Sequence, residues 1–346
     1  MFSQSIKVKE YTSSSIKGGA TKGIPIKIID SASVHGALKV NFLKFSVAML
    51  KANTKSNSSA FSQAYDIMLN ALFLYGLLDC KNSSICLKNG FRDKYRDFSR
   101  SSRTGELGQA INYIFSQEFL GYKYVFDFDE FLSVYSIASK KSGGTPDYVL
   151  LGKKNKNVSV LESKGSSALK ELTRPELRSR LQKAMDNQCL SGVVYLQKNK
   201  VKVSNSYASV VEFSETTESR DSFIHFADPE YDEFKEQSYS EALKNFYTRW
   251  IAFLLGRQDN DSVDIGKIKL SEYFDVREYQ GEQYYVQNKS YSNLNLIVPV
   301  FYGISSRVFN HILAEEYDYL YYLEMKALSL ENVEIFSDGT IAIGVN

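Results

Sequence analysis

A chain of 346 residues, 43% of them hydrophobic and 14% aromatic, is long and apolar enough to bury one large core or two smaller ones, which excludes a mostly disordered protein. Its formal net charge of +2 excludes attraction of nucleic acid by the overall field, so such a role must rest on local basic clusters. Three cysteines without a CxxC pair and three scattered histidines exclude a common zinc site and a disulfide framework. No window holds the roughly 20 apolar residues of a membrane span, and the N-terminus lacks a signal-peptide core, so we expect a soluble, cytoplasmic protein without membrane contact.

Residues 1–95 are expected to form a mainly helical region. Residues 1–24 are rich in Ser, Lys, Gly and Thr, but their glycines do not match the GxxxxGK[ST] pattern of a phosphate-binding loop. Apolar residues then recur at intervals of three and four from Val34 to Leu50 and from Phe61 to Leu78. This spacing predicts two amphipathic helices that pack on a later sheet.

A basic and aromatic segment follows, from Phe91 to Arg103. Basic side chains interleaved with aromatic rings suit the backbone and bases of a nucleic acid. A solvated connector whose charges are met by Asp93 and Asp97 explains the segment about equally well. Under the first interpretation the candidate nucleic-acid-binding residues are Arg96, Arg100 and Arg103.

A helix is predicted over Thr104 to Leu120, capped by Thr104 and ended by Gly121. It places Glu106 in its first turn, where the helix dipole alone also favours an acid. A strand is expected next, over Tyr122 to Phe131, and its Asp127 and Asp129 are reserve candidates for a metal-binding role.

The most informative stretch is a predicted hairpin. An apolar strand, Tyr148 to Leu151, and a second strand, Val158 to Leu161, flank a polar tip whose Lys153, Lys154 and Lys156 either grip nucleic acid or face water. Glu162 and Lys164 follow the second strand on one side, and Asp147 precedes the first strand opposite them. Because isolated charges are costly to desolvate, this pattern indicates a metal site, and a solvated Glu/Lys surface pair is the alternative.

Pro146-Asp147, a 14-residue gap and Glu162-x-Lys164 together resemble the PD-(D/E)xK nuclease superfamily, over roughly Thr104 to Leu196. The resemblance implies a mixed central β-sheet flanked by helices, the restriction-endonuclease-like core of an α/β protein. It also implies that Asp147 and Glu162, with Glu106 as the helical glutamate, bind Mg²⁺, for which Mn²⁺ can substitute. Lys164 would then position a water that cleaves DNA, with RNA an open alternative.

Further elements complete the core expected over residues 96–228. A helix is predicted over Arg174 to Asn187, and a buried strand over Gly192 to Leu196 would make a parallel crossover with the hairpin. Two more strands are predicted over Tyr207 to Phe213 and Phe223 to Phe226. His225 lies in an apolar run and is interpreted as a core histidine.

Residues 229–346 are expected to form an α+β region without identifiable chemistry. The predicted elements are a long helix over Glu230 to Gly256, a strand over Leu294 to Tyr302 and a helix over Val308 to Leu330. A final hairpin, Val333 to Val345, turns at Ser337-Asp338-Gly339.

Three functions are compatible with these features. The first is a metal-dependent DNA endonuclease in restriction, repair or phage defence, controlled by a regulatory protein partner. The second is a catalytically silent subunit with a nuclease-like fold that binds nucleic acid or a protein partner. The third is a structural subunit in which the motif is fortuitous.

Overall fold

The structure is a computed structural model. It describes residues 3–14, 27–53, 69–70, 72–140, 144–152, 158–167, 174–228, 239–257, 265–288 and 300–344. They fall into two compact units: unit 1 is built mainly from residues 42–74 and 238–346, and unit 2 from residues 2–41 and 75–237. Each unit therefore combines distant parts of the chain, whereas the sequence suggested three consecutive segments, 1–95, 96–228 and 229–346.

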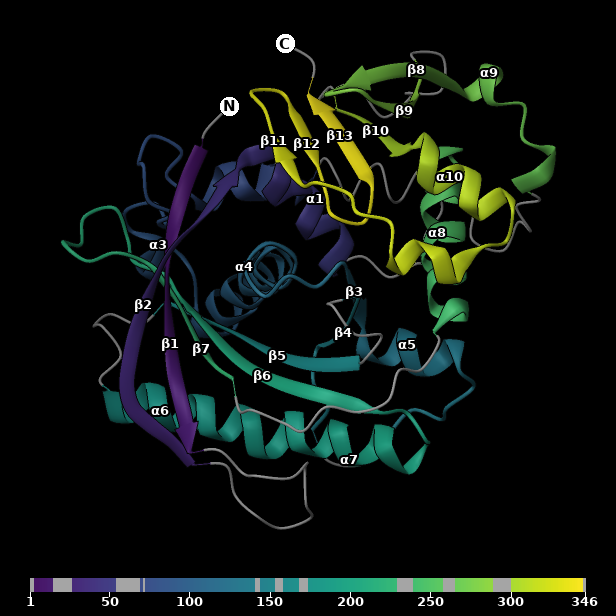
Figure 1. The fold of residues 1–346 in the computed structure, drawn as a ribbon. Coiled ribbons are helices and arrows are strands. Elements are labelled where there is room, and N and C mark those ends of the chain that lie inside the picture. Colours follow the sequence, from purple (N-terminus) through teal and green to yellow (C-terminus); the bar gives the residue numbers. More distant parts are fainter. Residues whose placement is uncertain are drawn as a thin grey trace. The chain divides into compact units, whose positions relative to one another are not determined.

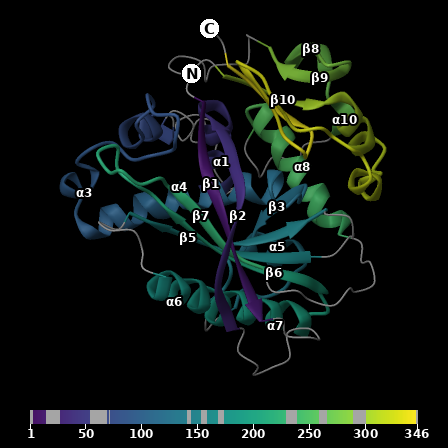
Figure 2. The same ribbon diagram turned by 60° about the vertical axis from the view of Figure 1, so that its left-hand side comes forward.

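Unit 2 is organised around a mixed sheet of seven strands in the order β2-β1-β7-β6-β5-β4-β3, seen in Figure 1 and Figure 2. The strands are β1 (Ser3–Ser14), β2 (Lys27–Asn41), β3 (Tyr124–Asp127), β4 (Tyr148–Leu151), β5 (Val158–Ser166), β6 (Val203–Glu212) and β7 (Phe223–Ala227). The pairs β5–β6 and β1–β7 are parallel, and the other neighbours are antiparallel. The predicted mixed α/β class is confirmed at this level.

The predicted helical leader is partly wrong. Residues 34–41 belong to β2, and the helix α1 spans only Phe42–Asn53. Leu38 and Val40 are buried while Ala37 and Lys39 are exposed, which is the two-residue alternation of a strand. This short alternation was read as the start of the helix that follows. Of the second predicted helix, residues 69–70 and 72–77 are helical, and residues 61–68 lie outside the described residues.

The helix expected from Thr104 begins earlier. After the short helix α3 (Phe91–Lys94), helix α4 spans Asp97–Glu118, so Thr104 is an interior residue whose hydroxyl donates to the Arg100 carbonyl at 3.0 Å. The strand expected over residues 122–131 is shorter than predicted. It ends at Asp127, whose side chain caps the helix α5 (Phe128–Val134).

The helices lie on both faces of the sheet. Helix α6 (Arg174–Ala184), a π-helical turn η1 (Met185–Cys189) and helix α7 (Leu190–Lys198) pack on one face, and α4 packs on the other. The strand predicted over Gly192 to Leu196 is therefore wrong, because this segment is the middle of α7. A short apolar run has no periodicity that separates a buried helix turn from a strand. The crossover strand is β6 instead, and it is parallel to β5.

Unit 1 holds a second sheet, with six strands in the order β11-β12-β13-β10-β9-β8. The strands are β8 (Phe274–Tyr279), β9 (Glu282–Gln287), β10 (Val300–Ser305), β11 (Leu328–Ser329), β12 (Val333–Ile335) and β13 (Thr340–Gly344). Besides α1 and the helical residues between 69 and 74, unit 1 contains the helices α8 (Ser240–Leu254), α9 (Leu270–Tyr273) and α10 (Ser306–Leu313) and the 3-10 turns η2 (Ile265–Lys267) and η3 (Tyr317–Tyr321).

Some of the elements predicted for unit 1 are confirmed and others are wrong. The terminal hairpin is confirmed as β12 and β13. The helix predicted over Val308 to Leu330 is too long, because α10 ends at Leu313. The helix expected over Glu230 to Gly256 is α8, which begins at Ser240, and the strand expected over Leu294 to Tyr302 is β10, which extends to Ser305. Residues 229–238 and 289–299 lie outside the described part of the chain. Within that part, no helix combines the length and apolarity needed to cross a membrane.

Candidate active site

The end of strand β5 carries the two charged residues of the hairpin motif. Glu162 is completely buried, while the Lys164 side chain is 43% exposed, and the Lys164 ammonium forms an ion pair with Glu162 Oε1. Both Glu162 oxygens are buried without a well-aligned hydrogen-bond donor among the residues that the structure describes. A buried carboxylate with spare lone pairs is costly unless a cation or a proton occupies it.

Asp147 lies across the ladder from these residues. Tyr148 pairs with Leu161, so Asp147 immediately before β4 faces the level of Glu162. Its Oδ2 accepts a hydrogen bond from the Ser163 amide at 2.7 Å, and its Oδ1 accepts one from Gln109 Nε2 at 3.3 Å. The structure thus brings Asp147, Glu162 and Lys164 together at one point of the sheet.

The electrostatics of the two acids are coupled. Burial, together with the nearby Asp147 carboxylate, raises the pKa of Glu162 to about 8, while Lys164 and Gln188 oppose the rise. Burial also raises the pKa of Asp147, against the lowering effect of the Ser163 amide and of Lys164. Two adjacent carboxylates repel each other when both are ionised, so the pair favours binding either a proton or a cation.

Helix α4 approaches β5 very closely at this point. A Cβ on Gly165 would lie 1.8 Å from the Thr104 carbonyl oxygen, so only glycine allows the contact. The approach sets Asn112, fully buried, against the strands: its Nδ2 donates to Ser163 Oγ at 2.7 Å and its Oδ1 accepts from Ser209 Oγ at 2.6 Å. The hydrogen bond from Asn112 holds the side chain of Ser163, the residue between Glu162 and Lys164.

Gln109 and Asn112 are residues of the candidate site that the sequence interpretation missed. A sequence signal exists, because Gln109, Asn112 and Ser116 are three and four residues apart and form a polar stripe along a helix that is rich in apolar residues elsewhere. Gln109 donates a hydrogen bond to Asp147, whereas Glu106 accepts one from Ser102 within its own helix.

Glu106 is not in the first turn of its helix. It lies well inside α4 and accepts a hydrogen bond from Ser102 Oγ at 3.2 Å, so the helix-dipole explanation for this acid no longer applies. Among the described residues, no three His, Cys, Asp or Glu side chains are arranged to hold one metal ion. Glu106 therefore does not complete a three-carboxylate site with Asp147 and Glu162.

The reserve candidates Asp127 and Asp129 have structural positions at the start of helix α5. Asp127 Oδ1 accepts the Glu130 amide hydrogen at 2.9 Å and so caps α5, and Asp129 is exposed in the first turn of that helix. Their positions are explained by the helix terminus, which favours acidic side chains.

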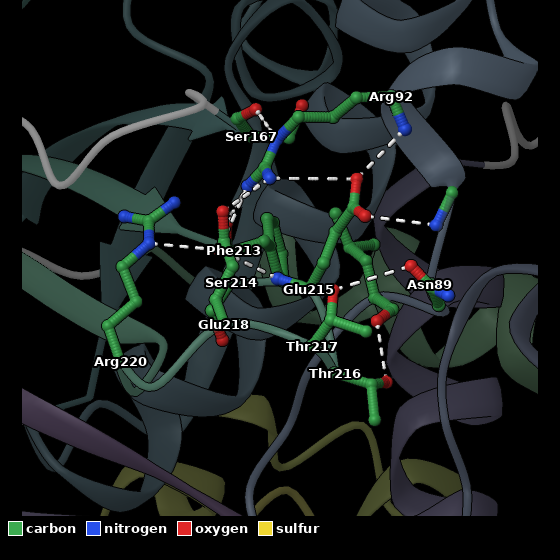
Figure 3. A network of polar contacts seen from close by, with 12 residues as sticks. Asn89, Arg92, Ser167, Phe213, Ser214, Glu215, Thr216, Thr217, Glu218 and Arg220 are labelled. Atoms are coloured by element: carbon green, nitrogen blue, oxygen red, sulfur yellow. Dashed lines mark hydrogen bonds and ion pairs between the residues drawn. The ribbon is translucent and has the colours of Figure 1, made fainter.

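Most of the predicted basic cluster is engaged within the protein. Arg92 is buried, contacts Glu215 and Glu218, and donates to the Ser167 carbonyl, in the network shown in Figure 3. Arg100 pairs with Asp97, and Arg103 lies over the Tyr95 ring at 4.5 Å.

The other residues predicted to bind nucleic acid lie in different parts of the protein. Arg96 is exposed at the start of α4. Arg100 is nine residues from Gln109, which puts it on the opposite side of α4 from the acidic pair at about 100° per residue. Lys153, Lys154 and Lys156 lie outside the described residues.

The segment before Asp147 rests on α7 and the π-helical turn. A Cβ on Gly192 would lie 2.4 Å from Pro146 Cδ, and one on Gly144 would lie 2.7 Å from Gln188 Cγ. These close contacts hold Asp147 at the start of β4 and bring Gln188 to Glu162. π-helical turns of this kind are frequent at functional sites.

Comparison with known proteins identifies no relative. No family model, curated protein or solved structure matches the chain. The site must therefore be interpreted from its own chemistry.

The donor set fits a hard divalent cation. Asp147 and Glu162 supply carboxylate oxygens, which Mg²⁺ and Mn²⁺ prefer, and the Glu162 oxygens are buried and poorly satisfied. With two acidic ligands, the remaining positions of an octahedral ion would fall to water or substrate oxygens, which is typical of Mg²⁺.

Proposed function

We propose that the protein is a Mg²⁺-dependent endonuclease of the PD-(D/E)xK type that hydrolyses phosphodiester bonds in DNA. The observation that carries the proposal is the convergence of Asp147, Glu162 and Lys164, two acids and one lysine, at the end of a buried hairpin. RNA as a substrate and control by a partner protein are further parts of the proposal.

The order of elements supports the same proposal. Helix α4, strand β3, helix α5, strands β4 and β5, the α6–α7 helix and strand β6 follow one another along the chain. Strand β6 lies beside β5 and parallel to it. A helix, a strand with the aspartate, a strand with ExK, a helix and a parallel strand are the order that the resemblance implies.

Each residue has a distinct part in this proposal. Asp147 and Glu162 would hold Mg²⁺, which when bound acts as a Lewis acid toward the phosphodiester. Lys164 keeps its ammonium partly exposed beside Glu162, where it can donate to a water or to a phosphate oxygen whose negative charge increases during cleavage. Gln109 and Ser163 orient Asp147 through the two hydrogen bonds to its carboxylate.

The test is cleavage of plasmid DNA by the purified chain in Mg²⁺. Asp147→Ala and Lys164→Ala are each expected to reduce the rate by at least about 100-fold, because the first removes a ligand of the Mg²⁺ ion and the second removes a positive charge beside the reacting phosphate. Asp129→Ala, which removes an exposed acid on α5, is the matched control and is expected to cleave like the wild type. Full cleavage by the Asp147 or Lys164 variant would refute the assignment.

A second candidate is a catalytically silent subunit that binds nucleic acid or a protein partner. The observation that favours it is the absence of a three-ligand group among the described residues, with Glu106 set apart from the acidic pair. It predicts Mg²⁺-independent binding of DNA without cleavage. Binding that survives Asp147→Ala, in a protein that never cleaves, would select this candidate.

A further inference from the structure

A cavity of about 300 Å³ lies along α7, beside the segment that follows α5. Its lining runs from Asp186 in the π-helical turn to Lys198 at the end of α7, at helical spacing, so one face of the helix forms its wall. The volume is at the lower end of the range for small-molecule sites, about 300–1,000 Å³. None of its lining residues takes part in the proposed nuclease chemistry.

One part of the cavity is cationic. Lys140 donates from Nζ to the Gly144 carbonyl at 2.9 Å and contacts Ser191 Oγ. Burial and the charge of nearby Lys198 lower the pKa of Lys140. Lys198 is exposed and has no ion-pair partner within the described ranges. Two ammonium groups that repel each other are stabilised by an anion placed between them.

Another part offers a hydrogen-bond acceptor. Asp186 Oδ2 accepts from Gln182 Nε2 at 2.8 Å, but Asp186 Oδ1 is buried and has no hydrogen-bond partner among the described residues. A buried acceptor without a donor costs about 1–3 kcal/mol, which a ligand N–H would recover once the Asp186 side chain turns this oxygen toward the cavity. Asp186 also repels a bare anion, so a ligand that satisfies the whole cavity must be anionic at one end only.

An apolar wall adjoins these groups. The Tyr195 hydroxyl donates to the Ala138 carbonyl, which fixes the orientation of its ring, and Leu190 and Val194 complete the surface. Such a wall suits an aromatic ring stacked against it. Ser191, beside Lys140, is about 7 Å along the helix from Asp186, a spacing of the size of a mononucleotide.

We propose that this cavity binds a nucleoside monophosphate. The phosphate lies between Lys140 and Lys198, beside Tyr195, the base packs on Leu190, and a base N–H donates to Asp186 Oδ1. A chain of contacts links the cavity to the candidate active site: Gly144, bonded by Lys140, packs on Gln188, which contacts Glu162. A ligand here would therefore stiffen the segment that precedes Asp147.

The test is calorimetry on the metal-free full chain with AMP, GMP, CMP and UMP, their nucleosides and inorganic phosphate. At least one nucleotide is expected to bind at least tenfold more tightly than its nucleoside and than phosphate. Lys198→Glu and Lys140→Met should each weaken that binding at least tenfold. Lys183→Glu makes the same charge change as Lys198→Glu at an exposed lysine of α6 outside the cavity, and it should leave binding unchanged. Since Lys198 is exposed, its variant keeps the test valid if Lys140→Met disturbs folding.

Asp186→Ala separates recognition of the base from attraction of any anion. It should weaken nucleotide binding and leave phosphate binding equal or stronger, because one repulsive charge is gone. No nucleotide binding at millimolar concentration, equal binding of inorganic phosphate, or an equal loss in Lys183→Glu would each overturn the proposal. The experiment requires neither metal nor cleavage, so its outcome is independent of the nuclease proposal.

Discussion

Glu162 combines complete burial with a carboxyl pKa of about 8, and this has a consequence for stability. A carboxyl whose pKa is higher in the folded state than in the unfolded state binds more protons when folded. The free energy of unfolding should then be highest below about pH 4.5 for this group and fall as the pH rises to about 8.

Glu162→Gln removes this pH-dependent penalty while keeping the size of the side chain. The quantity to compare is the unfolding free energy of the variant minus that of the wild type, in metal-free buffer. This difference should be larger at pH 8.5 than at pH 5, by at most about 5 kcal/mol. Urea unfolding at the two pH values measures the difference. If this difference were the same at both pH values, the pKa of Glu162 would not be raised in the folded protein.

Metal binding at the same residue should release a proton. Below pH 8 the Glu162 carboxyl must lose its proton to bind Mg²⁺, so the apparent affinity should rise up to about tenfold for each pH unit. Calorimetry in two buffers of different ionisation enthalpy counts the proton directly. Glu162→Ala should weaken Mg²⁺ and Mn²⁺ binding, and an affinity unchanged by this substitution would remove Glu162 from the metal site.

Gln109 and Glu106 offer a matched comparison on one helix. Gln109→Leu removes the amide that donates to Asp147 and should lower cleavage or metal affinity, whereas Glu106→Gln should be close to the wild type because Glu106 bonds within its own helix. Both variants should melt within a few degrees of the wild type. The opposite order of effects would restore Glu106 as the helical metal ligand that the family resemblance implies.

At the scale of elements, the packing of α4 on β5 positions both Gln109 and Asn112. Gly165→Ala would place a methyl group 1.8 Å from the Thr104 carbonyl oxygen, so the helix must shift, at a cost of about 1–3 kcal/mol or more. Gly105→Ala, in the same region of contact, meets nothing within 4 Å and should stabilise the helix by up to about 1 kcal/mol.

Urea midpoints of the two glycine variants give the comparison, and cleavage by Gly165→Ala should fall with its stability. If both alanines were equally tolerated, the close approach of helix and strand would not hold the site.

At the scale of the whole molecule, each unit has its own sheet and core, and unit 1 contains a buried ion pair. Lys51 Nζ contacts Asp338 Oδ2 at 2.9 Å and Thr340 Oγ1 at 2.8 Å, with both charged side chains almost fully buried. Burial opposes the ionised forms, but the Lys51 charge and the Thr340 hydrogen bonds lower the pKa of Asp338.

Lys51→Met should destabilise unit 1 by about 3–5 kcal/mol, because it removes the positive charge that offsets the buried Asp338 carboxylate. Hydrogen exchange measured by mass spectrometry should show faster exchange in β12 and β13, with β4 and β5 of unit 2 unchanged. Lys269→Met, which breaks an exposed pair with Glu272, is the control and should change stability by less than about 1 kcal/mol. Equal acceleration in both sheets would show that the two units unfold together.

Local sequence patterns were sufficient for several elements of this protein. The hairpin of β4 and β5, the strands β6 and β7 and the terminal hairpin were predicted correctly, because short alternating runs and turn residues encode them within a few positions. The opposition of Asp147 to Glu162 and Lys164 followed from that hairpin alone, since strand geometry determines which side chains share a face.

The remaining features depend on contacts between distant residues, which no local pattern carries. Strand β1 is parallel to β7, more than 200 residues away, and this pairing makes residues 3–14 part of the sheet. Residues 192–196 belong to α7, which continues α6 through the π-helical turn, although their composition also suits a strand. Gln109 reaches Asp147 only because Gly165 admits α4 close to β5, a steric effect that involves three separate segments. The raised pKa of Glu162 arises in the same way, because burial by the surrounding elements is a property of the folded chain alone.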